Sequence, residues 1–246
     1  TVEYQAKLDS SKVCNTDGSL KPEFSSLLGS AQTNTVKLAY SNNPHGTGEG
    51  TTVDHPAYDY TYGIDVTKVG SDKDEDGNPK ELDGVQFTLQ ESGSKEYIKT
   101  DGTLTPNRDD AILTTNSEGK INVVGLDEGT YVLKEVKPAP GYNNSAADGI
   151  TFTITNSGLP TNGDSFNPGC EFAEGTDANL VHSTSAPVGT ADGKVHLTVT
   201  DQKGTGLPLT GLNGVTFTWI AGGAVLCIGV AHLIRSRKQA EESEQE

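Results

Sequence analysis

Residues 62–69 read YGIDVTKV, a short run in which every second side chain shares one face of an extended strand. That face carries Tyr62, Ile64, Val66 and then Lys68. Further short alternating segments follow, bounded by turn residues, and they cover 84–90, 96–100, 119–124, 129–136, 149–155 and 194–202. Short strands with this spacing predict an immunoglobulin-like β-sandwich over residues 61–203. The polar, Gly-rich stretch 156–192 is expected to be a long loop.

Composition narrows the classes of function. The chain has 246 residues, of which 34 are acidic and 18 basic, and its net charge is −16. Nucleic-acid binding would require basic patches, so we expect no nucleic-acid partner. The five histidines lack the spacing of metal ligands, and no group of nucleophile, histidine and acid stands out. We therefore expect no metal, no cofactor and no enzymatic turnover.

The three cysteines do not form a disulfide framework. Cys14 and Cys170 lie in different expected domains, and Cys227 lies in an apolar C-terminal run. No pair therefore falls within one domain, although a bridge between Cys14 and Cys170 stays open.

Three of the predicted strands end on an ionisable residue. The apolar faces of the first, fifth and last strands run into Lys68, Glu135 and Asp201. A buried, unpaired charge is costly, and such groups neutralise by shifting their pKa values. Each side chain could reach water at a strand end, and the three together call for a shared explanation.

The surrounding residues resemble a known family. Residues 129–142, GTYVLKEVKPAPGY, resemble the E-box of the B-type repeat domain of collagen-binding surface proteins, the CnaB domain. LDGVQFTL at 82–89 and DVTKV at 65–69 resemble its second and first strands. Members of this family join a lysine of the first strand to an asparagine or aspartate of the last through an isopeptide bond, with help from the E-box glutamate. The resemblance implies these roles for Lys68, Asp201 and Glu135.

The resemblance also implies a mechanism. Burial is expected to lower the pKa of Lys68 and to raise those of Glu135 and Asp201, so that a neutral amine faces a neutral acid. Because the acceptor is an aspartate where the family more often has asparagine, water rather than ammonia would leave. The reaction is a single-turnover self-modification, and by loop-closure entropy the cross-link would stabilise the fold by about 5 kcal/mol.

Residues 1–60 hold too few predicted strands for a sandwich of their own. Strands are expected around 1–8, 33–41 and 57–62, and VEYQAKL and NTVKLAYSNNP resemble the end of the isopeptide-forming domain of fimbrial subunits. Asn34 shares the face of the apolar residues near it, so we expect a buried amide that accepts a lysine upstream of residue 1. Asn42 is the alternative, and a merely hydrogen-bonded asparagine stays equally open. The chain lacks Met and a signal peptide, so we expect its beginning upstream.

The C-terminal residues 204–246 indicate export. An apolar run at 215–234 is about 30 Å long as a helix, enough to cross a bilayer. The tail 235–246 begins with the basic RSRK, which would stay in the cytoplasm. Together with the preceding LPLTG this resembles the cell-wall sorting signal of Gram-positive surface proteins, which a sortase cuts between Thr and Gly. The motif residues are Leu207, Pro208, Leu209, Thr210 and Gly211.

An acidic turn between the first two strands has the spacing of a calcium loop. Asp72, Asp74 and Asp76 precede Gly77, with Asp83 at position 12. No helices flank the segment and position 12 is not glutamate, so a solvated acidic turn is favoured over a calcium site.

The whole arrangement resembles the backbone subunit of a sortase-assembled pilus. Tandem immunoglobulin-like sandwiches, one truncated, would precede a C-terminal transmembrane helix. The implied partners are sortase, other pilin subunits, peptidoglycan, the membrane before processing and a host surface ligand, and the implied location is the cell wall. The acceptor lysine of the pilin motif would lie upstream. A monomeric wall-anchored adhesin, with these domains as its stalk, is the alternative; an exported enzyme finds no support in these residues.

Overall fold

The computed structural model describes residues 8–15, 17–43, 45–184 and 191–204. The sorting motif, the apolar run 215–234 and most of the expected first strand lie outside this part of the chain. Within the described ranges the fold is all-β, and no helix there is long and apolar enough to span a membrane.

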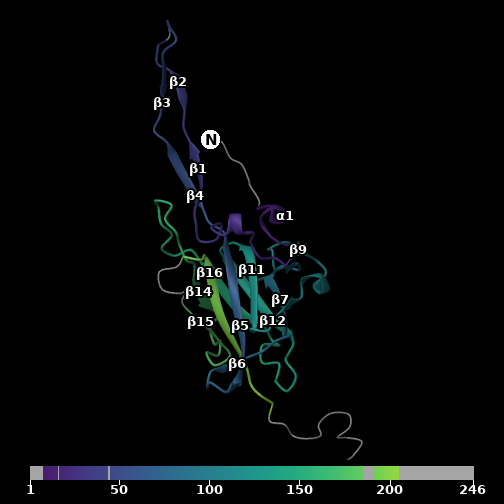
Figure 1. Ribbon diagram of the computed structural model, residues 1–246. Helices are drawn as coiled ribbons and strands as arrows, with labels where there is room; N and C mark the ends of the chain where they lie inside the picture. Colours follow the sequence, from purple (N-terminus) through teal and green to yellow (C-terminus); the bar gives the residue numbers. More distant parts are fainter. Residues whose placement is uncertain (1–7, 16, 44, 185–190, 205–246) are drawn as a thin grey trace, which may run out of the picture. The chain divides into compact units, whose positions relative to one another are not determined.

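Two sheets form the sandwich (Figure 1). The first has the order β10 (Leu113–Thr114), β7 (Gln86–Glu91), β12 (Gly129–Lys137), β13 (Ile150–Thr155) and β14 (Gly169–Phe172). The second has the order β11 (Lys120–Leu126), β5 (Tyr62–Lys73), β16 (Lys194–Asp201) and β15 (Val181–Thr184), with β6 (Pro79–Glu81) also paired to β5. A small pair, β8 (Tyr97–Ile98) with β9 (Leu104–Thr105), precedes the 3-10 turn η2 (Arg108–Ala111).

The predicted strands between 62 and 155 and at 194–202 are present, with ends shifted by a few residues. The expectation of a loop over 156–192 is wrong in part, because β14 and β15 lie within it. Both are edge strands of four residues, and each is held by one neighbour, β13 or β16. Their sequences carry too little apolar alternation to distinguish them from a loop.

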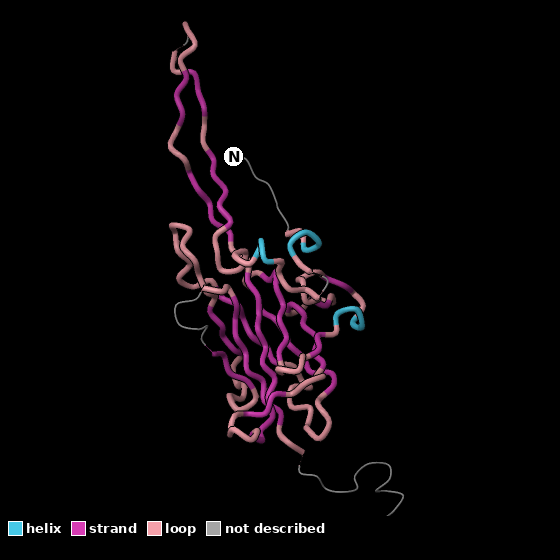
Figure 2. Tube along the Cα trace, in the orientation of Figure 1, coloured by secondary structure: helices cyan, strands magenta, loops and turns pink. Residues whose placement is uncertain are grey.

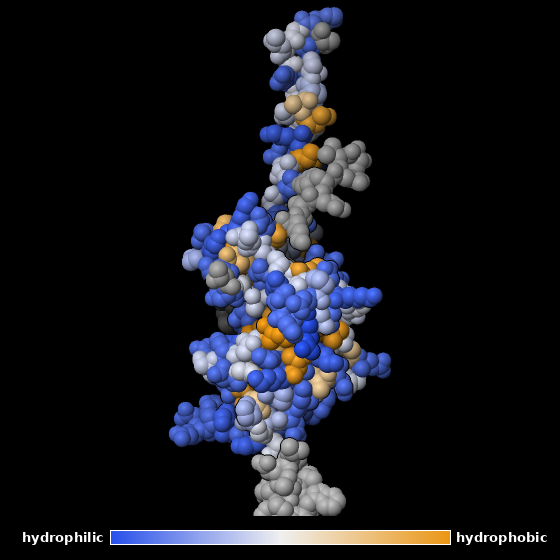
Figure 3. All heavy atoms as spheres, turned by 90° about the vertical axis from the view of Figure 1, so that its right-hand side faces the viewer, coloured by the Kyte–Doolittle hydropathy of each residue, from blue (hydrophilic) through white to orange (hydrophobic). Residues whose placement is uncertain are grey.

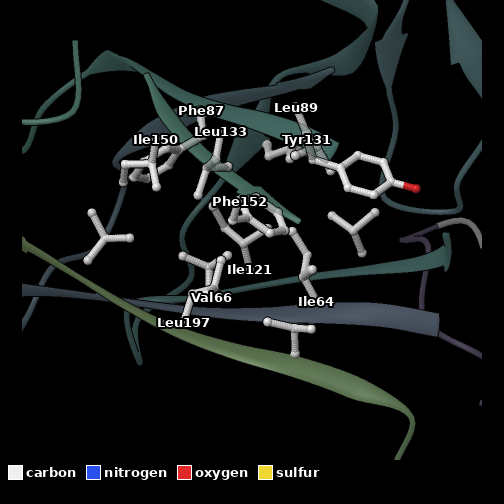
Figure 4. Packing of buried hydrophobic residues seen from close by; sticks show 14 of the residues in the cluster. Ile64, Val66, Phe87, Leu89, Ile121, Tyr131, Leu133, Ile150, Phe152 and Leu197 are labelled. Atoms are coloured by element: carbon white, nitrogen blue, oxygen red, sulfur yellow. The ribbon is translucent and has the colours of Figure 1, made fainter. Parts of the chain in front are cut away.

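Alternation places one face of each strand in a shared core. Ile64 and Val66 from the second sheet meet Phe87, Leu133 and Phe152 from the first, and all five are fully buried (Figure 4). Burial of this apolar surface is the main source of stability for such a sandwich, because hydrogen bonds alone contribute little net free energy.

The first and last strands of the sandwich are neighbours. β5 and β16 run parallel, with Val199 opposite Lys68 and Asp201 opposite Gly70. Every other ladder among the described strands is antiparallel. A parallel pair needs a long crossover, which here is the rest of the domain.

Residues 8–60 do not form a second sandwich in the described structure. A short helix α1 (Ser10–Val13) and a 3-10 turn η1 (Pro22–Phe24) lead to a small cluster in which Val13, Cys14 and Leu28 pack with Val124. A two-stranded ribbon follows (Figure 2), built from β1 (Gln32–Val36) with β4 (His55–Asp59) and from β2 (Ala39–Ser41) with β3 (Glu49–Thr51).

The ribbon corrects the expectation for Asn34. Its side chain is exposed, and so are its apolar neighbours Val36 (61%) and Leu38 (62%), because no described element covers the ribbon at these positions. Figure 3 shows hydrophobic residues among hydrophilic ones along the ribbon. Asn42 is also exposed, and its amide donates a hydrogen bond to the carbonyl of Glu49 at 3.2 Å.

Candidate functional site

The structure brings Lys68, Glu135 and Asp201 together. Lys68 lies on β5 and Asp201 on the adjacent β16, while Glu135 reaches across from β12 in the facing sheet. All three are buried, with exposed fractions of 0%, 1% and 0%. The cluster therefore links the first strand, the last strand and the opposite layer of the sandwich.

Local backbone structure fixes the three side chains. Lys68 is two residues after Val66 and Asp201 two after Val199, so period-2 alternation points both into the core. The backbone N–H of Lys68 donates to the carbonyl of Gly119 at 2.7 Å, which holds the strand at this point. The ladder between β12 and β7 shifts register just after Glu135, and that irregularity ends the regular pairing beside the site.

The contacts are close. Lys68 Nζ lies 2.7 Å from Asp201 Oδ1 and 3.7 Å from Glu135 Oε2. The short contact does not have the angles of a hydrogen bond, and Lys68 Nζ, Asp201 Oδ2 and both carboxylate oxygens of Glu135 have no hydrogen-bond partner among the described residues. Buried polar atoms of native proteins are normally satisfied, so a cluster of unsatisfied ionisable atoms calls for a chemical explanation.

Electrostatics favour the neutral forms of two of these groups. Burial lowers the pKa of Lys68, and the nearby Asp201 carboxyl opposes that shift. Burial also raises the pKa of Glu135 to about 7, opposed by the charge of Lys68 and reinforced by Asp201. A neutral amine is a nucleophile and a protonated carboxyl can donate a proton, so the cluster has the groups needed to form an amide.

Sequence reasoning missed the loop between β12 and β13. The backbone N–H of Ser145 donates to Asp201 Oδ1 at 3.3 Å, and the N–H of Glu135 donates to the carbonyl of Ala146 at 3.1 Å. The turn residues Pro140 and Gly141 predict a change of direction after β12, but no sequence pattern indicates that the loop returns to Asp201.

The acidic turn uses its carboxylates within the protein. Asp72 contacts Lys203 Nζ at 2.7 Å and accepts a hydrogen bond from the Tyr142 hydroxyl at 2.6 Å, and these bonds lower the pKa of Asp72 to about 2. Asp74 Oδ1 accepts the backbone N–H groups of Asp76 and Asn78 at 3.0 and 2.8 Å, as in a tight turn. Across the ranges that the structure describes, no three acidic, histidine or cysteine side chains are grouped to hold a metal.

The two described cysteines are free thiols. Cys14 is buried and Cys170 is partly buried, and burial raises the pKa of both thiols, that of Cys170 to about 11. The bridge between them that the sequence left open is therefore absent from the structure.

Comparison with known proteins finds one family match, which lies within the sandwich. Residues 64–166 match the SpaA family, described as a prealbumin-like fold domain. The matched segment includes Lys68 and Glu135, whereas Asp201 lies beyond its end. No protein among those with curated functions matches the chain.

Among solved structures, the chain is similar to three streptococcal pilus proteins. It is 19% identical to the pilus 2b backbone protein of group B streptococcus, covering 63% of this chain and 46% of that one with a TM-score of 0.36. For the 35 kDa C-terminal fragment of the major pilin GBS80 of Streptococcus agalactiae the identity is 20%, the coverage 71% and 55%, and the TM-score 0.43. For the T6 backbone pilin of Streptococcus pyogenes these values are 20%, 70% and 43%, and 0.38. The chain thus spans about half the length of these structures.

Proposed function

We propose that this protein is a structural subunit of a covalently polymerised, sortase-assembled surface pilus. The observation that carries the proposal is the buried cluster of Lys68, Glu135 and Asp201, which we assign to an isopeptide bond within the domain 61–203. The prealbumin-like family match over 64–166 supports a fold that builds such a site from its strands.

The proposed chemistry is an amide condensation. Neutral Lys68 Nζ attacks Cγ of Asp201, the Nζ–Cγ bond forms, and one Cγ–O bond breaks. The carboxyl group reacts in its protonated form, so the departing oxygen already carries one proton. Glu135 moves a second proton to it from the attacking nitrogen, and the oxygen leaves as water. No oxidant or reductant is required. Formation of the amide consumes a buried amine and a buried carboxyl group, whose charges the site cannot hydrate. Each molecule reacts once, so the protein is not an enzyme in the ordinary sense.

The sequence supports assembly outside the cell. We assign residues 207–211 as the sortase motif, residues 215–234 as the transmembrane helix and 235–246 as the cytoplasmic tail, within a sorting signal at 204–246. In this proposal sortase joins the Thr210 carboxyl to a lysine of the next subunit, or finally to peptidoglycan. Residues 1–60 would be the end of a preceding fimbrial domain that supplies the acceptor lysine upstream, with Asn34 as a cross-link residue only if that domain covers the ribbon.

The alternative function is a monomeric wall-anchored adhesin with these domains as its stalk. It would carry the same sorting signal and the same internal cross-link. What distinguishes the two functions is whether Thr210 is joined to other copies of the subunit.

An immunoblot of cell-wall extracts boiled in detergent tests the proposal, with an antibody against residues 62–203. Covalent polymers survive boiling, so a pilus subunit gives a ladder of rising mass, and Thr210→Ala removes it. Lys68→Ala is the matched control because it removes the internal bond and leaves the sorting motif intact; the ladder should persist. A single wall-linked band in the wild type would replace the pilus with the adhesin.

A further inference from the structure

The loop between β12 and β13 docks on the end of β16. Tyr142 forms an antiparallel bridge with Lys203, and the N–H of Asn143 donates to the carbonyl of Gln202 at 3.0 Å. In return, the N–H of Gln202 donates to Ser145 Oγ at 3.3 Å. Residues 142–146, here called the clamp segment, therefore extend the pairing of the last strand beside Asp201.

The clamp segment is also tied to the strand that carries Glu135. The Glu135 N–H donates to the carbonyl of Ala146 at 3.1 Å, and the Asn144 side-chain amide donates to the Glu135 carbonyl at 3.4 Å. One short segment thus holds the backbone on both sides of the site. Because it is fixed at several points, its N–H groups are aimed before any reaction takes place.

One of those N–H groups points into the site. The Ser145 N–H is shared between two acceptors. It donates to the carbonyl of Asn143 at 3.0 Å and to Asp201 Oδ1 at 3.3 Å, and that oxygen lies 2.7 Å from Lys68 Nζ. Asp201 Oδ2 is buried and has no hydrogen-bond partner among the described residues. The two oxygens of the carboxyl group are therefore in different environments.

We propose that the Ser145 backbone N–H is the oxyanion donor of the isopeptide reaction, an inference that rests on the proposed function. When Nζ attacks Cγ, negative charge develops on Oδ1, and the N–H stabilises it. Oδ1 is then retained as the amide oxygen. The carboxyl group reacts in its protonated form, with its proton on Oδ2. The Cγ–Oδ2 bond breaks, Oδ2 receives a second proton that Glu135 carries from Nζ, and it leaves as water.

The resting distance suits this role. A donor that favours the transition state over the ground state should bind the tetrahedral oxyanion better than the planar carboxyl. The bond to Oδ1, at 3.3 Å, is the longer of the two that this N–H makes, and it can shorten at the expense of the 3.0 Å bond to the Asn143 carbonyl as Cγ becomes tetrahedral. Loss of a single oxyanion donor slows comparable reactions by about 100-fold or more.

Two variants remove the N–H and two keep it. Ser145→Pro lacks the donor, and an ester-linked serine analogue at position 145, introduced by suppression in cell-free translation, lacks it without a change of side chain. Ser145→Ala keeps the N–H and removes the hydroxyl bonded to Gln202. Ala147→Pro is the matched proline control: Ala147 occupies the second position of the turn closed by the Gly149 N–H to Ala146 carbonyl bond at 3.1 Å, where proline is favoured.

The experiment follows water loss in pulse-labelled full-length chain after translation. Samples are quenched in denaturant at intervals. The cross-linked and unlinked chains are then separated by electrophoretic mobility and distinguished by intact mass. We expect Ser145→Pro and the ester variant to react about 100-fold more slowly than wild type, and Ser145→Ala and Ala147→Pro to react within a few fold of it. Protease resistance of samples kept free of denaturant reports folding.

The outcomes separate the two proposals. If wild type never loses water, the isopeptide function itself fails. If wild type reacts and the ester variant keeps pace with it, the oxyanion role of Ser145 is overturned while the isopeptide function stands. If Ser145→Ala is as slow as the ester, loss of either hydrogen bond of Ser145 has the same effect. The residue then acts by holding the clamp segment in place, and the oxyanion role of its N–H is overturned. If Ser145→Pro is protease-sensitive, it is misfolded, and the rate of the ester variant alone tests the role of the N–H.

Discussion

Lys68 Nζ meets Asp201 Oδ1 at 2.7 Å, although the strand register places Val199, not Asp201, opposite Lys68. The contact runs diagonally between neighbouring parallel strands, two residues along the same inward face. A lysine side chain is long enough to make this diagonal reach. The geometry thus brings an amine to a carboxyl group at the point where the last strand ends.

The first prediction concerns mass. We expect the folded protein to have an intact mass one water below the value calculated from its sequence, and Lys68→Ala to have its full calculated mass. Lys203→Ala is the matched control. Lys203 lies two residues after Asp201 and pairs with Asp72 at the surface, so this variant should still lose water. An unchanged wild-type mass, measured by mass spectrometry, would sink the Lys68–Asp201 assignment.

A second prediction concerns the leaving group. Asp201→Asn offers an amide in place of the acid, so condensation would release ammonia and give the same cross-linked product as wild type. The two folded proteins should therefore have identical masses, although their calculated unlinked masses differ. Asp201→Ala has no leaving group and should keep its full mass. Any mass difference between folded wild type and Asp201→Asn would mean that at least one of them had not reacted.

The third prediction concerns pH. In the structure burial raises the pKa of Glu135 to about 7, against about 4.3 in the unfolded chain, and Lys68→Ala removes the lysine charge that opposes this shift. The folded state then binds more protons between these values. Stability from protonated Glu135 is fully present below about pH 4.3 and is lost as pH rises through about 7.

Urea unfolding of Lys68→Ala at a series of pH values measures this loss. Lys68→Ala with Glu135→Gln is the control, because glutamine does not titrate, and the difference between the two variants isolates Glu135. We expect the midpoint of Lys68→Ala to fall relative to the control between about pH 4.3 and 7. Parallel curves would show that Glu135 is not desolvated as the structure indicates.

The fourth prediction contrasts the core with the ribbon. Phe87 is fully buried, and Phe87→Ala should lower the unfolding free energy by about 3–5 kcal/mol. Val36 and His55 are paired at the end of the β1–β4 ladder, so an Asn-Gly turn can replace residues 37–54. Because the ribbon beyond this pair is exposed, the shortened chain should unfold at the same urea concentration as the parent. A large drop would mean that the ribbon supports the sandwich.

Alternation of apolar residues was enough to predict the sandwich and to place Lys68, Glu135 and Asp201 on inward faces, because period-2 burial is a local property of a strand. It was not enough to predict β14 and β15, because each is only four residues long and too short to show a clear alternation. Asn34 shows the opposite failure: its apolar neighbours indicate a buried face, but burial needs a covering layer, and the described residues supply none. Ser145 was missed because a backbone N–H has no sequence signature.

The parallel pairing of β5 and β16 has a mechanical consequence. A pull applied between Tyr62 and Gly204 enters at the start of β5 and leaves just beyond the end of β16. With Lys68 joined to Asp201, tension would travel through residues 62–68, cross the amide and exit through 201–204. Residues 69–200 would carry none of it, so the sandwich could not be drawn out into an extended chain while the cross-link held.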